Sequence, residues 1–217
     1  MFRHKAMEQI AVFDFDGTVI RGDSVVALLL FARKRKLISS LGLLKAAWYG
    51  ALYHLRLTDA LTAKQKSHSF LMKIPEAARE SFLREFAGTL ADRAFPGALE
   101  QIKKHRAAGD TVILCSASCS CYMRYVFPLI GAEHLLCTPC GPDGRVLGPN
   151  CRGQEKVRRV YEWLDARKIP HSAICAAYGD SMGDAPILLA SAQPVLVNPK
   201  RSLRRALPKA RLTYWQE

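Results

Sequence analysis

The stretch QIAVFDFDGT at residues 9–18 runs from a strand into an acidic turn. Its β-branched and aromatic residues predict a strand over 9–15 that ends in the sequence Asp14-Phe15-Asp16-Gly17-Thr18. Short apolar runs predict three more buried strands, at 111–115, 173–179 and 194–198. Helical patterns separate the later strands, which is typical of βαβ units. We therefore expect an α/β fold, a Rossmann-like parallel sheet flanked by helices.

A long helical segment interrupts this pattern after the first strand. Within it, the apolar residues of 76–92 recur every three or four positions, which is the spacing of one helix face. Strand-like alternation is missing from residues 21–88. We therefore expect a core domain made of residues 1–20 and 89–217, with an inserted all-helical domain over 21–88.

The composition is ordinary for a globular protein except in its charge. Of the 217 residues, 49% are hydrophobic and 24% are charged, which excludes disordered, collagen-like and low-complexity classes. The formal net charge of +13 indicates an anionic partner: nucleic acid, acidic lipid or a phosphorylated substrate. Residues 21–88 contribute 12 basic and 5 acidic residues, a net +7 and more than half of the excess. Charge alone does not choose among these partners.

Residues 37–55, LISSLGLLKAAWYGALYHL, form the most membrane-like window, directly after the basic run Arg33–Lys36. Lys45, His54 and two serines interrupt the window, which disfavours a spanning helix. Two interpretations remain: a pair of buried helices, or a helix lying on an anionic membrane surface. Because the start of the chain lacks a signal-peptide pattern, we expect a cytoplasmic protein. Any contact with the inner membrane surface would be peripheral.

Seven cysteines in a cytoplasmic chain are expected to be reduced and mostly buried. Four of them, in the patterns C-x-C and C-x-x-C, loosely resemble a structural zinc site: Cys119, Cys121, Cys137 and Cys140. C-x-C is an unusual zinc knuckle, and no histidine flanks the set at finger spacing. Plain thiols are therefore the favoured interpretation, with zinc left open.

Polar side chains occupy the predicted carboxyl ends of three strands, where open parallel sheets bind ligands. The strand-end residues are Asp14, Asp16, Ser116, Asp180 and Asp184. Lys156 joins them from the start of a helix that lies between the second and third of these strands in the sequence. Several carboxylates at one sheet edge repel each other unless a cation lies among them. Hard oxygen ligands favour Mg²⁺, which completes its coordination with water and phosphate. A hydroxyl at Ser116 and an ammonium at Lys156 would bind the remaining phosphate oxygens.

Four features of the sequence resemble, in their order, the four motifs of the haloacid dehalogenase superfamily. They are DFDGT, the serine after a hydrophobic strand, the downstream lysine and GDSMGD. GPNCRGQEK, AAYGDSMGD and LVNPKRSLRR resemble its phosphoserine-phosphatase-like branch, subfamily IB. The resemblance covers essentially the whole chain and implies that the inserted helical segment is a cap. It also implies a Mg²⁺-dependent phosphomonoester phosphatase that forms an aspartyl-phosphate.

The resemblance implies a role for each motif residue. Asp14 would be the nucleophile, and Asp16 would protonate the leaving alkoxide and then activate water. Ser116 and Lys156 would bind the transferring phosphoryl group. The implied ligands of Mg²⁺ are Asp14, the backbone carbonyl of Asp16, and Asp180, with Asp184 supporting the metal shell.

Two positions depart from the phosphoserine phosphatase pattern. Asp23 stands where those enzymes carry a glutamate that reads the substrate amine, and Ser116-Ala117-Ser118 replaces Ser-Gly-Gly. Asp23 would either contact substrate, with Ala117 and its neighbours, or cap a helix that begins at about Ser24. The branch also contains phosphatidylglycerophosphatases, so an apolar, basic cap suits an anionic lipid phosphate. A small phosphorylated metabolite is the other substrate class.

Two alternative functions follow from the charge and the fold. The basic clusters Arg33–Lys36 and Lys200–Arg205 could contact nucleic-acid backbones. No recognition helix or stacking aromatics accompany them, so no nucleic-acid partner is expected. A non-catalytic phosphate sensor is also disfavoured, because every catalytic position of the motifs is filled. The sequence makes no prediction of oligomeric state.

Overall fold

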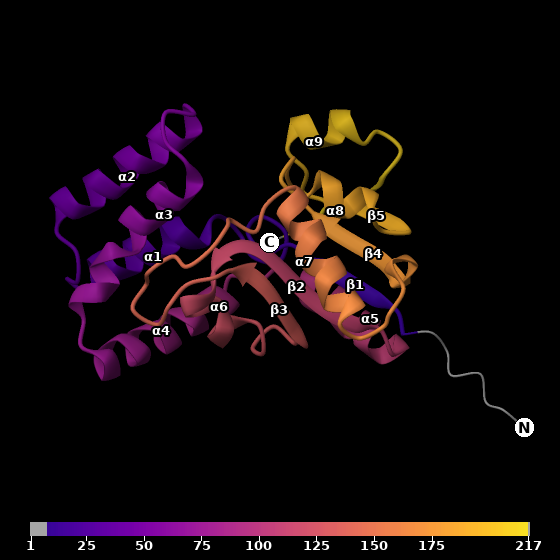
Figure 1. The fold of residues 1–217 in the computed structure, drawn as a ribbon, viewed down its shortest axis with the longest axis horizontal. Coiled ribbons are helices and arrows are strands. Elements are labelled where there is room, and N and C mark those ends of the chain that lie inside the picture. Colours follow the sequence, from indigo (N-terminus) through magenta and orange to yellow (C-terminus); the bar gives the residue numbers. More distant parts are fainter. Residues whose placement is uncertain (1–7, 217) are drawn as a thin grey trace, which may run out of the picture.

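A computed structural model describes residues 8–216 (Figure 1). Its centre is a six-stranded parallel sheet in the order β3-β2-β1-β4-β5-β6. The strands are β1 Ile10–Phe13, β2 Thr111–Cys119, β3 His134–Thr138, β4 Ile174–Gly179, β5 Gln193–Val197 and β6 Arg211–Thr213. The predicted α/β fold with a Rossmann-like parallel sheet is confirmed.

Helices cover both faces of this sheet, which is why its central strands are apolar throughout. Ala11 and Phe13 of β1 point to the face that packs against α5 and α6, while Ile10 and Val12 point to the opposite face. The helices of the core are α5 Pro96–Ala108, α6 Ser120–Val126, α7 Gln154–Asp165, the 3₁₀ turn η2 His171–Ala173, α8 Ala185–Leu189 and α9 Arg201–Ala206. The helix α5 ends at Gly109, whose φ of 87° is the left-handed conformation of a glycine C-cap.

The segment between β1 and α5 folds as a helical unit beside the sheet, on the left in Figure 1. It comprises α1 Ser24–Lys34, α2 Ser40–His54, α3 Ala60–His68, the 3₁₀ turn η1 Ser69–Lys73 and α4 Glu76–Ala91. The chain enters and leaves this unit side by side, because Ile20 and Ala94 form a bridge and Arg21 N–H donates to the Arg93 carbonyl at 3.0 Å. We call α1–α4 the cap. Its boundaries at 21 and 88 stay a proposal, and α4 itself runs past position 88.

The first two cap helices differ in burial. In α1, Ala27, Leu28 and Leu29 are buried, and Phe31 packs against Phe82 and Phe86 of α4. Among the described side chains of α2, Ala46 alone is buried. A buried helix pair therefore describes α1 but not α2. Within residues 8–216, no helix combines the length and apolarity needed to cross a bilayer.

Candidate active site

Three aspartates meet at the carboxyl edge of the sheet. Asp14 follows β1 directly, Asp180 follows β4, and Asp184 lies at the start of α8. Because β1 and β4 are parallel neighbours in register at Phe13 and Tyr178, the residues after them lie side by side. One carboxylate oxygen from each aspartate lies within 4.8 Å of the others, and all three side chains are buried. We call these three residues the aspartate cluster.

Two glycines allow this close approach. Gly17 has φ 78°, and a Cβ there would lie 2.7 Å from Asp180 Oδ2. A Cβ on Gly179 would lie 2.5 Å from Asp184 Cβ. A larger residue at either position would push the carboxylates apart.

Lys156 of α7 inserts its ammonium group between two members of the cluster. Its Nζ donates to Asp14 Oδ1 at 2.6 Å and to Asp184 Oδ1 at 2.7 Å, and the side chain is fully buried. Burial opposes the charge of the lysine, but the adjacent carboxylates hold its pKa well above the usual range. The ion pairs position both aspartates.

The charge of Lys156 offsets only part of the effect of burial on the pKa of Asp14. Burial, together with the neighbouring Asp184 and Asp180, raises the pKa of Asp14 to about 8, although Lys156 opposes the shift. Thr18 Oγ1 donates to the other Asp14 oxygen at 3.1 Å. Lys156 alone does not offset the burial of Asp14, so a further cation here would favour the ionised form of Asp14.

The other two cluster members have separate partners. Asp184 accepts hydrogen bonds at Oδ2 from the backbone N–H and hydroxyl of Ser181, at 3.1 and 2.9 Å. Although burial opposes ionisation, Lys156 and these bonds lower the pKa of Asp184. Burial raises the pKa of Asp180, and this effect is opposed by Lys200 of the basic cluster 200–205, 2.9 Å away. Lys200 therefore contacts the site instead of belonging only to a solvated face.

Asp16 lies apart from the cluster and faces the cap. It accepts hydrogen bonds from the Ser24 N–H at 2.7 Å, the Ser24 hydroxyl at 3.0 Å and the Ser118 hydroxyl at 2.6 Å. The Ser24 hydroxyl also contacts Tyr122 at 3.0 Å. Burial and the charge of Asp23 together raise the pKa of Asp16 to about 6, against the hydrogen bonds from Ser118 and Ser24. The motif pattern predicts Asp16 as a site residue, but its contacts with Ser24 and Ser118, and theirs with Tyr122, depend on how the cap meets β2 and carry no sequence signal.

Ser116 and Ala117 lie in β2 beside this edge. Ser116 is buried, and its hydroxyl oxygen accepts from the Ser118 N–H at 3.0 Å. The Ala117 carbonyl accepts from the Thr138 hydroxyl at 2.6 Å and from Lys64 of α3. Lys64 also donates to Asn150, and burial lowers its pKa. This cap lysine was missed by the sequence analysis, because nothing in a helical pattern marks a lysine that points at the core.

Asp23 is exposed and caps α1. Its Oδ1 accepts from the N–H groups of Val25 and Val26 at 2.8 and 2.9 Å. This is the N-cap geometry expected for an aspartate before a helix that begins at Ser24. A contact between Asp23 and substrate stays a prediction.

The four cysteines of the zinc interpretation are buried free thiols. Within the described part of the chain, no group of three neighbouring metal-ligating atoms includes any of them. Cys115 and Cys151 form a separate thiol contact at 3.8 Å.

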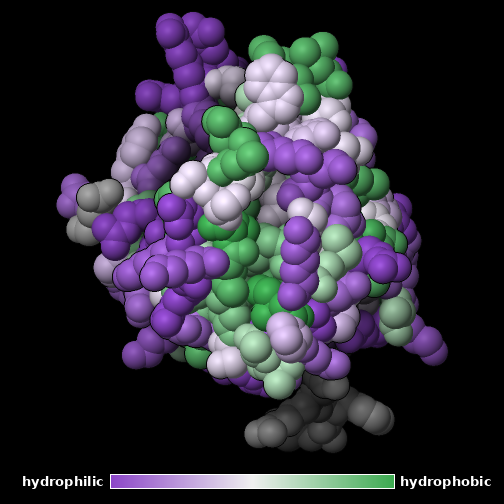
Figure 2. Space-filling view, turned by 90° about the vertical axis from the view of Figure 1, so that its left-hand side faces the viewer, coloured by the Kyte–Doolittle hydropathy of each residue, from purple (hydrophilic) through white to green (hydrophobic). Residues whose placement is uncertain are grey.

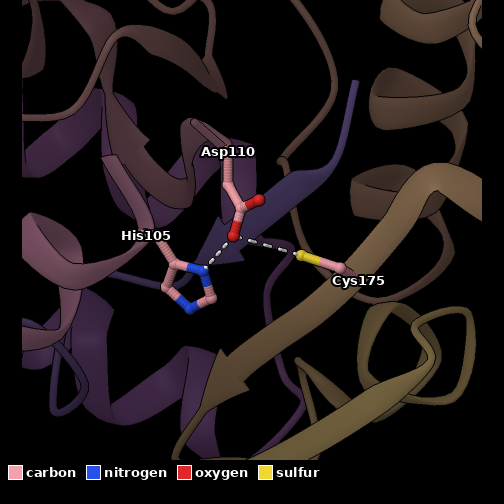
Figure 3. A group of neighbouring side chains, drawn as sticks. All are labelled: His105, Asp110 and Cys175. Atoms are coloured by element: carbon pink, nitrogen blue, oxygen red, sulfur yellow. Dashed lines mark hydrogen bonds and ion pairs between the residues drawn. The ribbon is translucent and has the colours of Figure 1, made fainter. Parts of the chain in front are cut away.

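A second group of metal-ligating atoms lies at the opposite, amino edge of the sheet (Figure 3). Asp110 Oδ2 contacts His105 Nδ1 at 2.7 Å and Cys175 Sγ at 3.8 Å. The other nitrogen of His105 lies 2.8 Å from the Tyr178 hydroxyl. Burial raises the pKa of Cys175 to about 11. Both ring nitrogens are thus engaged and the thiol keeps its proton, so this group joins α5 to the sheet.

Residues 11–189 match the haloacid dehalogenase-like hydrolase family. The chain belongs to this family. The match includes β1 with Asp14 and Asp16, the cap, and the region of Asp180 and Asp184. The chain is accordingly an enzyme, a hydrolase, and its named relatives place it among the phosphatases of the family.

Two relatives cover most of the chain. Protein CicA of Caulobacter vibrioides is 32% identical over 198 residues, covering 82% of this chain and 81% of its own. A histidinol-phosphatase of Neisseria meningitidis is 28% identical over 216 residues, covering 92% of this chain and 94% of its own.

Solved structures share the fold at low identity. A Bordetella pertussis Tohama I protein of unknown function has a TM-score of 0.85 at 23% identity, covering 95% of this chain and 98% of its own. A phospho-aspartyl intermediate analogue of phosphoserine phosphatase has a TM-score of 0.68 at 16% identity, covering 97% and 95%. The fold is therefore that of the phosphoserine-phosphatase-like branch.

Proposed function

We propose that the enzyme is a Mg²⁺-dependent phosphomonoester phosphatase that works through an aspartyl-phosphate on Asp14. The observation that carries this proposal is the buried aspartate cluster, with the Lys156 ammonium 2.6 Å from Asp14. Ser116 lies on the neighbouring strand β2, and its hydroxyl would join the Lys156 ammonium in binding the phosphoryl oxygens. This set can neutralise a phosphoryl group and attack it.

The donor set of the cluster suits Mg²⁺. All its donors are carboxylate oxygens, which are the ligands that Mg²⁺ prefers in proteins. Asp14, Asp180 and the Asp16 carbonyl would hold the ion, with Asp184 supporting them. When bound, Mg²⁺ would neutralise the charge of a phosphoryl oxygen and keep Asp14 ionised.

The reaction would then proceed in two steps, transfer of the phosphoryl group to Asp14 and its release by water. An Asp14 oxygen attacks phosphorus, the bond from phosphorus to the ester oxygen breaks, and Asp16 gives its proton to the departing alkoxide. Asp16 next takes a proton from a water molecule that attacks the aspartyl-phosphate. Inorganic phosphate leaves, and both carboxyl groups return to their starting states. Ser116 and Lys156 bind the phosphoryl oxygens throughout.

For the substrate we propose a small phosphorylated metabolite, on the strength of the histidinol-phosphatase relative, which covers nearly the whole chain. The second candidate is an anionic lipid phosphate, favoured by the exposed apolar residues of α2. The residues of the cap are where substrate selection would occur. The proposed location is the cytoplasm.

The test is hydrolysis of p-nitrophenyl phosphate by the wild type, Asp14→Asn and Asp165→Asn, with Mg²⁺ or with a chelator. We expect Mg²⁺-dependent turnover in the wild type and in Asp165→Asn, which alters an exposed aspartate of α7. Asp14→Asn should lose at least about a thousandfold in kcat. Equal, metal-independent rates in all three proteins would overturn the proposal. Phosphate binding without turnover in the wild type would instead support a sensor.

A further inference from the structure

The helix α2 presents an exposed apolar stripe. Leu41, Leu44, Trp48 and Leu55 are 74, 66, 61 and 67% exposed. They are three, four and seven residues apart, so they lie on one face of α2 and its C-cap. We call these four residues the α2 stripe. The helix is about 22 Å long, at 1.5 Å per residue. Isolated exposed leucines are common on proteins, but a continuous row along a whole helix marks an interaction surface.

Hydrophobic residues also reach the surface next to this helix. On α1, which packs against α2, Val26 and Leu30 are exposed and one turn apart. Figure 2 looks onto the cap side of the molecule and shows hydrophobic residues reaching the surface in several places among hydrophilic ones. The exposed apolar residues of α1 and α2 therefore lie on two neighbouring helices of the cap.

The charged residues of the segment that carries the stripe are all basic. Residues 24–57 contain six lysines and arginines and no aspartate or glutamate. Four of the basic residues form the run Arg33–Lys36, which spans the last turn of α1 and the residues after it, Lys45 lies within α2, and Arg56 follows its end. Within this run, Arg35 is paired with Glu85 of α4. All six side chains are exposed.

The combination of exposed apolar residues and basic charge indicates which kind of partner binds the α2 stripe. A second copy would bring an equally basic face against the first, and like charges would repel. A nucleic acid would satisfy the charges but leave the leucines and the tryptophan in water. The surface of an anionic bilayer accepts both, because lysine and arginine meet the headgroups while apolar and indole side chains enter the interface.

We propose that the α2 stripe docks the cap onto the surface of an anionic lipid bilayer, with α2 lying in the plane of the interface. The helix would enter the headgroup region without crossing the membrane. Docking by the cap would leave the aspartate cluster on the core and would hold the enzyme at the membrane. The inference goes beyond the proposed chemistry and does not depend on it.

The test is co-sedimentation with vesicles of phosphatidylcholine alone or mixed with phosphatidylglycerol, at low and physiological ionic strength. The wild type should bind the phosphatidylglycerol vesicles, more strongly at low ionic strength. The double variant Leu44→Glu/Trp48→Glu should lose about tenfold or more in partition coefficient. The matched control is Leu189→Glu, an equally exposed leucine on α8 of the core, which should bind like the wild type. Brominated lipids should quench the fluorescence of the wild type more than that of Trp48→Phe.

Three results would overturn the proposal. The first is no binding by the wild type at low ionic strength, and the second is equal binding by the double variant. The third is dimerisation of the wild type in sedimentation velocity, abolished in the double variant without any lipid binding, which would assign the stripe to a second copy. Hydrolysis of soluble p-nitrophenyl phosphate by the same proteins separates the two proposals. If the wild type did not hydrolyse p-nitrophenyl phosphate, the proposed phosphatase chemistry would be wrong. The docking proposal would still stand or fall on the lipid-binding results alone.

Discussion

Asp14 and Asp16 are two residues apart, yet their surroundings give them different chemistry. Asp14 points to Lys156 and the other carboxylates, whereas Asp16 points to hydroxyl groups at the cap side. Hydroxyl groups can donate to either protonation state of their partner, so Asp16 can lose and regain its proton. The Lys156 ammonium favours the ionised form of Asp14, against the burial and the neighbouring carboxylates that raise its pKa.

The pKa of Asp16, raised to about 6 by burial, predicts a leaving-group dependence. A raised pKa keeps the acid protonated below about pH 6, so proton donation is available there and declines as the pH rises. Asp16→Asn should slow hydrolysis of an alkyl phosphate by about a hundredfold or more. It should slow p-nitrophenyl phosphate much less, because nitrophenolate departs without a proton. The measurement is the pH profile of kcat/KM for both substrates. An equal loss on both would contradict the assignment.

The residues at strand ends could be predicted from the sequence, because the carboxyl ends of parallel strands meet at one edge. That rule correctly brings Asp14, Asp180 and Asp184 together. It does not indicate Lys64 or Ser24, whose positions depend on how the cap packs on the core. The roles of the strand-end residues stay predictions.

At the scale of the element, Asp23 decides how α1 begins. Asp23→Ala should cost about 1 kcal/mol of unfolding free energy, because two N–H groups lose their acceptor. Asp23→Asn should cost little, since asparagine is an equally good N-cap. Removing the charge in Asp23→Asn should lower the pKa of Asp16 and shift its pH profile to lower pH. Urea denaturation and the pH profile check these outcomes. A large rise in KM in Asp23→Asn would show a substrate contact instead.

The helix α3 is fastened to the core by Lys64, which reaches Ala117 and Asn150. Lys64→Met should loosen this contact by about 1–2 kcal/mol, the worth of charge-assisted hydrogen bonds. Amide hydrogen exchange in α3 should then become faster. Lys45→Met, which alters an exposed lysine of α2, should leave that exchange unchanged. Unchanged exchange in Lys64→Met would mean that apolar packing alone holds the cap.

Most helices and strands with a regular apolar spacing or a continuous apolar run could be predicted from the sequence. Those that form only through contacts with neighbouring elements could not. The apolar spacing predicted α4, and the apolar runs predicted β1, β4 and β5. The strand β3 begins the turn-rich stretch 135–150 and has half-buried residues, so it shows no clean pattern. The three residues of β6 form a strand only by pairing with the edge strand β5. For α2 the composition indicated a helix, but burial is set by its neighbours.

At the scale of the whole molecule, the aspartate cluster links stability to pH and metal. Burial raises the pKa of Asp14 from 3.8 to about 8, so its contribution to stability is present below about pH 4 and is lost as the pH rises through 8. Mg²⁺ should offset this loss. We expect it to raise Tm more at pH 8 than at pH 5, with about 2.7 kcal/mol of stabilisation at a hundredfold excess over Kd. Thermal unfolding with and without a chelator measures this. The same increase in Asp180→Asn would contradict the assignment of the site.

The central claim is that phosphate is transferred to Asp14 before water releases it. The most direct measurement is acid quenching of the enzyme during turnover of p-nitrophenyl phosphate labelled in its phosphoryl group, followed by mapping of the label to a peptide. We predict label on the peptide that contains Asp14 in the wild type and more of it in Asp16→Asn, where activation of water is impaired. Asp14→Asn should carry none. Hydrolysis by the wild type with no label on that peptide in either active protein, or label that persists in Asp14→Asn, would contradict the account.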